Sequence, residues 1–118
     1  MRFILITLFL FEFSIAQINW SNVYGDTHMD EGWFISKTDD GGYILSGMEF
    51  YTAVIKKIDS SGNLIWSKTY DNPTETDGYP GDDVIKSVRQ TSDGGYIATG
   101  YFENENSWSR VSWIFKTD

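Results

Sequence analysis

The sequence contains no cysteine and a single histidine, His28. These shortages exclude disulfides, thiolate catalysis, cysteine-ligated zinc sites and any metal site that needs two histidines. Basic residues are also scarce, with 9 Lys and Arg against 17 Asp and Glu, and the longest basic run is Lys56-Lys57. A net charge of −8 without a basic cluster argues against nucleic acid as a partner, because phosphate binding needs a concentrated positive surface.

No apolar run reaches the roughly 20 residues that cross a bilayer as a helix. The longest run, Phe3 to Phe11, follows the positive charge of Arg2 and precedes the small residues Ser14 and Ala16. This order is typical of a secretory signal peptide, which we place at residues 1–16. We therefore expect an exported chain of residues 17–118 without a membrane span, located outside the cell or at its surface, with the periplasm as the alternative compartment.

Residues 18–118 contain two copies of one pattern. The segment 36–47, SKTDDGGYILSG, returns as 89–100, RQTSDGGYIATG, at an offset of 53 residues. Upstream, residues 19–24 match 65–70 at an offset of 46, and downstream 54–59 match 113–118 at an offset of 59. The growing offset places insertions between the matched segments, as expected for loops on a repeated scaffold. The pattern predicts a first repeat at about 18–63 and a second at about 64–118.

The matched segments are rich in β-branched and aromatic residues, and Asp-Gly-Gly turns separate them, which predicts antiparallel hairpins. The expected strands of the first copy are roughly 31–38, 43–48, 53–59 and 64–70. We therefore expect an all-β fold of about two four-stranded, propeller-type blades, the second ending at its third strand. A closed ring needs at least four blades, or about 180 residues, so we expect a truncated protein, or units that join other chains through exposed edges.

The segments Trp66-Ser67-Lys68-Thr69-Tyr70 and Asp93-Gly94-Gly95-Tyr96-Ile97 resemble the Trp-x-Lys-Thr-Tyr and Asp-Gly-Gly-Tyr-Ile repeats of secreted β-propeller-like proteins of Bacteroidota. The resemblance covers nearly all of residues 18–118 and implies a truncated member of that family. It departs after Tyr70, where Asp71 replaces the usual glycine. The resemblance implies a surface protein but little about chemistry, because many members have no assigned activity.

Two aromatic positions recur between the copies. Trp20 and Trp66 share one position, and Tyr43 and Tyr96 share the other. Recurrence at equivalent strand positions predicts packing between adjacent blades rather than a ligand platform. The single histidine, His28, is expected in a loop, because no serine lies in a nucleophile-elbow sequence that would make a catalytic triad.

The second copy carries an insertion at residues 101–110 that joins aromatic rings to amides. Tyr101, Asn106 and Trp108 could stack on and hydrogen-bond a sugar ring, with Arg110 at the rim. The alternative is a long hairpin that packs Trp108 on its own blade. These four residues are the candidate ligand-binding residues.

Acidic side chains crowd the two loops that precede the opening strand of each copy. Such oxygen ligands could hold Ca²⁺, but the Asp-x-Asp-x-Asp-Gly spacing is absent, which favours solvated loops. Asp82 or Asp83 could also belong to a carboxylate pair for glycoside hydrolysis. The acidic residues concerned are Asp26, Asp30 and Glu31 in the first loop and Asp71, Glu75, Asp77, Asp82 and Asp83 in the second.

The sequence assigns no catalytic, cofactor-binding or metal-binding residue. The function it favours is a non-enzymatic, exported repeat module that serves as a scaffold or adhesion surface and binds protein or glycan. The alternative is a fragment of a propeller-bearing secreted hydrolase whose catalytic part lies elsewhere.

Overall fold

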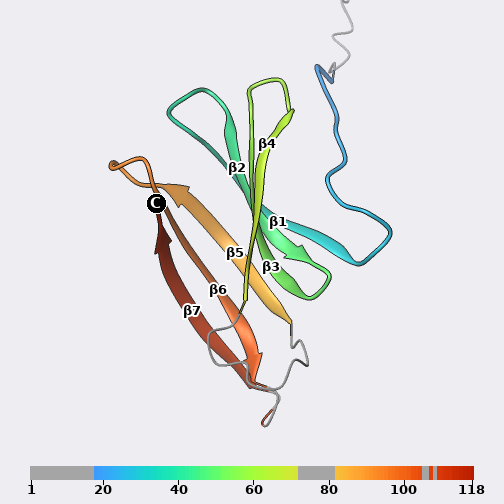
Figure 1. Ribbon diagram of the computed structural model, residues 1–118, viewed down its shortest axis with the longest axis vertical. Helices are drawn as coiled ribbons and strands as arrows, with labels where there is room; N and C mark the ends of the chain where they lie inside the picture. Colours follow the sequence, from blue (N-terminus) through green and yellow to red (C-terminus); the bar gives the residue numbers. More distant parts are fainter. Residues whose placement is uncertain (1–17, 72–81, 105–106, 108) are drawn as a thin grey trace, which may run out of the picture.

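The computed structural model describes residues 18–71, 82–104, 107 and 109–118 (Figure 1). Two antiparallel sheets make up this part of the chain. Sheet A contains β1 (Asp30–Lys37), β2 (Tyr43–Glu49), β3 (Thr52–Ile58) and β4 (Leu64–Tyr70), in that order. Sheet B contains β5 (Asp83–Gln90), β6 (Tyr96–Asn104) and β7 (Ser109–Thr117), also in chain order. The all-β, antiparallel prediction is confirmed, and no helix in the described ranges could span a membrane.

The Asp-Gly-Gly turns of the two sheets are built alike. Asp40 Oδ1 accepts hydrogen bonds from Thr38 Oγ1 at 2.6 Å and from the Gly42 amide at 3.0 Å. In sheet B the carboxylate of Asp93 accepts the corresponding bonds, 53 residues later. The middle glycine of each turn is left-handed, with φ of 83° at Gly41. An L side chain there would be strained, so the turn requires glycine.

Each sheet also has an irregularity in its first strand. Register shifts bypass Trp33 in β1 and Lys86 in β5, two positions that are 53 residues apart. Beside each bulge the second strand carries a glycine pressed against a carbonyl group of the first strand. A Cβ atom on Gly47 would lie 1.9 Å from a backbone oxygen, and one on Gly100 would lie 1.8 Å from another. Glycine therefore lets the two strands approach at the same place in both sheets.

The two sheets pack face to face, and β5 contacts β1, β2 and β3. The core between them is formed by Ile44, Ala53, Ile55, Ile85, Val88, Tyr96 and Ala98. At its border the Trp66 ring meets Tyr96 edge to face, with centroids 5.7 Å apart. Trp66 and Tyr96 therefore lie between the two sheets. This is the location predicted from the recurrence of each residue type in both sequence copies.

Sheet A consists of the four strands expected for the first blade, so a sheet and a copy of the sequence pattern do not begin at the same strand. Residues 64–70, which open the second sequence copy, form β4 and complete sheet A. Their counterpart, residues 18–24, forms no strand with the described residues and lies on the opposite face of sheet A from sheet B. There Trp20 lies 6.3 Å from Tyr43 and remains 38% exposed. One Trp–Tyr pair is thus in the core, and the other is on an open face.

Candidate binding surface

The turn between β2 and β3 has an unusual composition. Glu49 pairs with Thr52, so the connection has two residues, Phe50 and Tyr51. Both are left-handed, with φ of 47° and 65°. Two-residue hairpin turns of this kind normally contain Asn and Gly, because a side chain in this conformation costs about 1–2 kcal/mol per residue. Two aromatic residues therefore occupy a turn whose backbone disfavours them.

Both rings are also exposed, Phe50 at 55% and Tyr51 at 37%. The Phe50 ring meets the His28 ring edge on, with centroids 4.8 Å apart. The centroids of the Phe50 and Tyr51 rings lie 5.6 Å apart. His28 in turn lies 2.6 Å from the Asp26 carboxylate. Two hydrogen bonds lower the pKa of Asp26. The larger effect comes from the His28 backbone amide and the smaller from the His28 ring. These contacts support the Phe50 ring on one edge while its surface stays open to solvent.

The end of β6 and the start of β7 place a second group of side chains near this turn. The Arg110 guanidinium lies over the Tyr101 ring, 4.5 Å from its centroid, and Arg110 Nε donates to Glu103 Oε1 at 3.2 Å. The bond to Glu103 raises the pKa of Arg110, whose side chain is 62% exposed. The structure thus brings Tyr101 and Arg110 together. The other two candidate residues, Asn106 and Trp108, lie outside the described residues.

The start of β5 joins the turn to this hairpin. The Asp83 amide donates to the Tyr51 carbonyl at 2.9 Å, and the Glu103 amide donates to the Asp82 carbonyl at 3.2 Å. The β2–β3 turn, the start of β5 and the end of β6 lie at the same end of the two sheets (Figure 1). We call this end the hairpin-end surface and define it by Phe50, Tyr51, Asp82, Tyr101, Glu103 and Arg110.

The chemistry of this surface is divided between its two sides. Phe50 and Tyr51 expose aromatic rings, whereas the Tyr101 ring is already covered by the Arg110 guanidinium. On the Arg110 side, burial raises the pKa of Asp82, and the charge of Glu103 adds to this effect. The surface therefore offers open rings for stacking beside carboxylate and guanidinium groups for hydrogen bonding.

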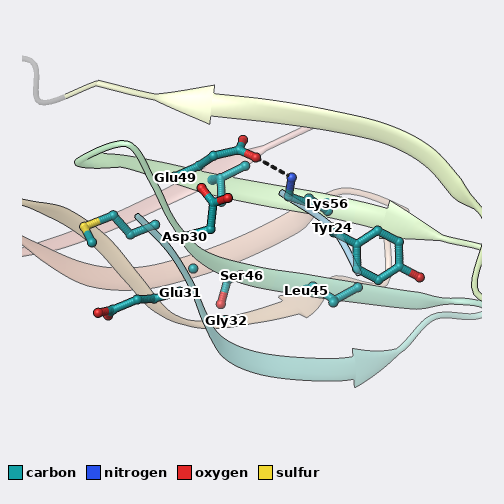
Figure 2. Close-up of a pocket in the computed structure, with 11 residues that line it drawn as sticks. Tyr24, Asp30, Glu31, Gly32, Leu45, Ser46, Glu49 and Lys56 are labelled. Atoms are coloured by element: carbon teal, nitrogen blue, oxygen red, sulfur yellow. Dashed lines mark hydrogen bonds and ion pairs between the residues drawn. The ribbon is translucent and has the colours of Figure 1, made fainter. Parts of the chain in front are cut away.

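A pocket of about 120 Å³ lies on the open face of sheet A (Figure 2). Tyr24 and Lys56 both line it, and Lys56 Nζ lies 2.8 Å from Glu49 Oε1. Ligand pockets usually reach about 300–1,000 Å³, so this one is too small for a sugar or a cofactor. A more open hollow of about 440 Å³ lies beside it, against Asn22, Tyr24 and Leu64. The hairpin-end surface is the candidate for binding because its aromatic rings are exposed.

The acidic loop before β1 uses its carboxylates locally. Asp26 accepts two bonds from His28, and Asp30 Oδ2 accepts the Asp26 amide at 2.9 Å. Among residues 18–71, 82–104, 107 and 109–118, no three acidic or histidine side chains converge as a metal site would require. Glu75 and Asp77 of the second loop lie outside these ranges. Calcium binding there stays a prediction from the sequence.

Phe50 and Tyr51 are the surface residues that the sequence patterns missed. The sequence does contain a signal for them. The connection between β2 and β3 is short and has no glycine, asparagine or aspartate to adopt a left-handed conformation. A two-residue turn without such residues indicates backbone strain at exposed side chains.

No protein-family model, curated protein or solved structure matches this chain.

Proposed function

We propose that this protein is a non-enzymatic, exported module of stacked, propeller-type sheets that binds glycan through the hairpin-end surface. The observation that carries the proposal is the pair of exposed aromatic residues in the left-handed β2–β3 turn. Strained backbone persists where function requires it, and exposed rings are costly to keep on a small protein. Both features coincide at Phe50 and Tyr51.

The chemistry of the surface suits a sugar. The Tyr51 and Phe50 rings would stack on the apolar face of a pyranose, as aromatic residues do in amphipathic binding sites. Glu103 and Arg110, whose ion pair is on the surface, would exchange hydrogen bonds with its hydroxyl groups. Asp82 adds a further acceptor at the same end of the sheets.

The stacked scaffold explains how these groups are held. The turns, bulges and close glycine contacts recur at one offset in both sheets, which supports a repeated, blade-type unit. In such a unit the strands are fixed by their neighbours, and the ends of the hairpins are left for binding. The hydrolase alternative stays a prediction, because its catalytic residues would lie in a part of the protein beyond this chain.

A glycan array with the purified full chain tests the binding proposal. We expect glycan binding without release of products, and a loss of about tenfold in affinity for Tyr51→Ala, since one aromatic stacking contact contributes roughly 1 kcal/mol or more. Leu64→Ala, at an exposed residue of β4, is the matched control and should bind like the unmodified chain. Sugar hydrolysis, or equal binding by Tyr51→Ala, would contradict the proposal. Mass spectrometry should place the N-terminus of the exported form at Gln17.

A further inference from the structure

Among the described residues, an unpaired segment lies on the outer face of sheet A, and an unpaired strand edge lies on sheet B. We infer that residues 18–24 of one copy add to the free edge of β7 in a second copy, completing its sheet B as a fourth strand. This inference rests on the stacked, repeated scaffold of the proposed function and names a partner for it. The partner is a second copy of this chain, arranged head to tail.

The acceptor is the outer edge of β7. In sheet A the third strand, β3, pairs with a fourth, β4, whereas among the described residues β7 ends sheet B. β7 matches β3 in its ion pair with the Asp-Gly-Gly turn. Lys116 Nζ lies 2.6 Å from Asp93 Oδ2 in sheet B, and Lys57 Nζ lies 2.9 Å from Asp40 Oδ2 in sheet A. An unpaired strand edge presents a row of amide and carbonyl groups that favours pairing with another strand.

The donor is the segment 18–24, the sequence counterpart of β4. It makes no strand pairing within the described chain, yet it already occupies the place on sheet A that β4 occupies on sheet B. Trp20 lies on Tyr43 as Trp66 lies on Tyr96, with centroid distances of 6.3 Å and 5.7 Å. Tyr24 lies beside Lys56 in the pocket of Figure 2. The equivalent Tyr70 contacts Phe115 at 4.8 Å.

The outer face of sheet B is the surface that would be covered. Ile97 and Ile114 lie on this face and are 45% and 70% exposed. Their counterparts in sheet A, Ile44 and Ile55, are completely buried against sheet B. The same comparison holds for lysine, because the Lys57 side chain is 5% exposed and that of Lys116 is 45% exposed. Sheet B therefore presents outward the residue types that sheet A buries.

A second copy would pair both the segment and the strand edge at once. Its sheet A, with residues 18–24 lying on it, would cover the outer face of sheet B while these residues pair with β7. Such a contact joins different surfaces of the two copies, so it generates rings or filaments rather than a symmetric dimer. The two turn rings of the hairpin-end surface would stay accessible, because Phe50 and Tyr51 remain exposed at the existing contact between the two sheets. Tyr101 and Arg110 share the outer face of sheet B with Ile97 and Ile114 and would lie at the edge of the new contact.

The pairing of β3 with β4 gives the register of the new contact. Ile55 faces Lys68 and Val54 faces Thr69. At the matched positions Asn22 of one copy would face Ile114 of the other, and Val23 would face Trp113. Because alternate residues point to opposite faces, a thiol at position 23 would point away from a thiol at position 114.

Disulfide trapping tests this register, and the natural absence of cysteine makes the background clean. The full chain is purified as Asn22→Cys and as Ile114→Cys, and the two variants are mixed under mild oxidation. We expect a covalent dimer in the mixture at several times the yield of either variant alone. The control mixture of Val23→Cys with Ile114→Cys should give little dimer, because its thiols lie on opposite faces. Equal yields from the two mixtures would overturn the inference.

Sedimentation of the unmodified full chain provides the second measurement. We expect oligomers at micromolar concentrations and dissociation by Ile114→Lys, which places a charge on the face to be covered. Phe50→Lys, at an exposed turn residue that the new contact leaves uncovered, should leave the oligomers intact. A monomer at all concentrations, or oligomers that Ile114→Lys leaves intact, would overturn the inference. Glycan binding by such a monomer would leave the proposed function standing.

Discussion

The Trp66 ring meets the Tyr96 ring edge to face, with their centroids 5.7 Å apart, at the border of the core between the two sheets. Trp66 belongs to the fourth strand of sheet A and Tyr96 to the second strand of sheet B. This contact therefore fastens one sheet to the next. The same residue types meet again at Trp20 and Tyr43, where no second sheet covers them in the described chain.

Removing the two tryptophans should have unequal effects on folding. Trp66→Ala should lower the free energy of unfolding by about 2–3 kcal/mol, because it opens space between the sheets. Trp20→Ala should cost about 1 kcal/mol or less in the monomer, since Trp20 is partly exposed and outside the core. Urea unfolding at low protein concentration measures both values. A larger loss for Trp20→Ala would show that the N-terminal segment, not β4, holds the structure together.

Replacing the β2–β3 turn should separate stability from binding. Phe50→Asn combined with Tyr51→Gly supplies the residues that this turn favours, so the free energy of unfolding should rise by about 1–3 kcal/mol. The same double variant should lose glycan binding, because both exposed rings are gone. Thermal unfolding and the glycan array provide the two measurements. A destabilised double variant would mean that the rings contribute more to folding than the backbone strain costs.

The close glycine contact between β1 and β2 should tolerate no side chain. Gly47→Ala would press a Cβ atom to within 1.9 Å of the Glu31 carbonyl oxygen, so the strands must separate. We expect a loss of roughly 1–3 kcal/mol, as is typical when a core is overpacked. Gly32→Ala is the control in the neighbouring strand, since its added methyl group meets nothing within 4 Å. Equal unfolding midpoints for the two variants would contradict the tight strand contact.

Stability should fall in acid because of the turn aspartates. Side-chain hydrogen bonds hold the pKa of Asp40 well below its ordinary value. The largest effect comes from Thr38 and the next largest from Lys57. For Asp93 the Lys116 bond is the largest cause of the same lowering. The unfolded chain therefore binds protons that the folded chain does not, and the stabilisation present above about pH 4 is lost as the pH falls through the folded pKa.

Asp40→Asn tests this dependence. It should unfold more easily than the unmodified chain at pH 7 and show a smaller loss of stability between pH 5 and about pH 2. Asp39→Asn is the matched control. The hydrogen bond of Asp39 to Gln90 is donated by its backbone amide, so the substitution leaves this bond in place. Urea unfolding midpoints across this pH range provide the measurement. Identical slopes for Asp40→Asn and the unmodified chain would exclude the turn carboxylate as a source of acid sensitivity.

Local chemistry explains how much of this fold could be predicted. Asp-Gly-Gly turns and β-branched runs specify hairpins within a few residues, so the boundaries of the first four strands fall within one residue of their predicted positions. Which sheet a strand joins depends on contacts far along the chain. For β4 the short turn after β3 is sufficient, and residues 64–70 complete sheet A as predicted, whereas their counterpart, residues 18–24, forms no strand with the described residues.

The binding surface was predictable only in part. Tyr101 and Arg110 lie on facing strands close to one hairpin, so their sequence separation was enough to bring them together. Phe50 and Tyr51 join them through the start of β5, which packs there because of the sheet-to-sheet contact. Their left-handed backbone follows from strand register, a property that composition alone does not specify.

Residues 18–24 are expected to act as the missing fourth strand of a neighbouring sheet B, and the assembly depends on this pairing. Hydrogen exchange of the unmodified chain at low and high protein concentration tests this claim directly. We predict that amides in residues 18–24 and along β7 become protected together as concentration rises, because the two strands hydrogen-bond each other. Rapid exchange of residues 18–24 at all concentrations, with oligomers present, would contradict it.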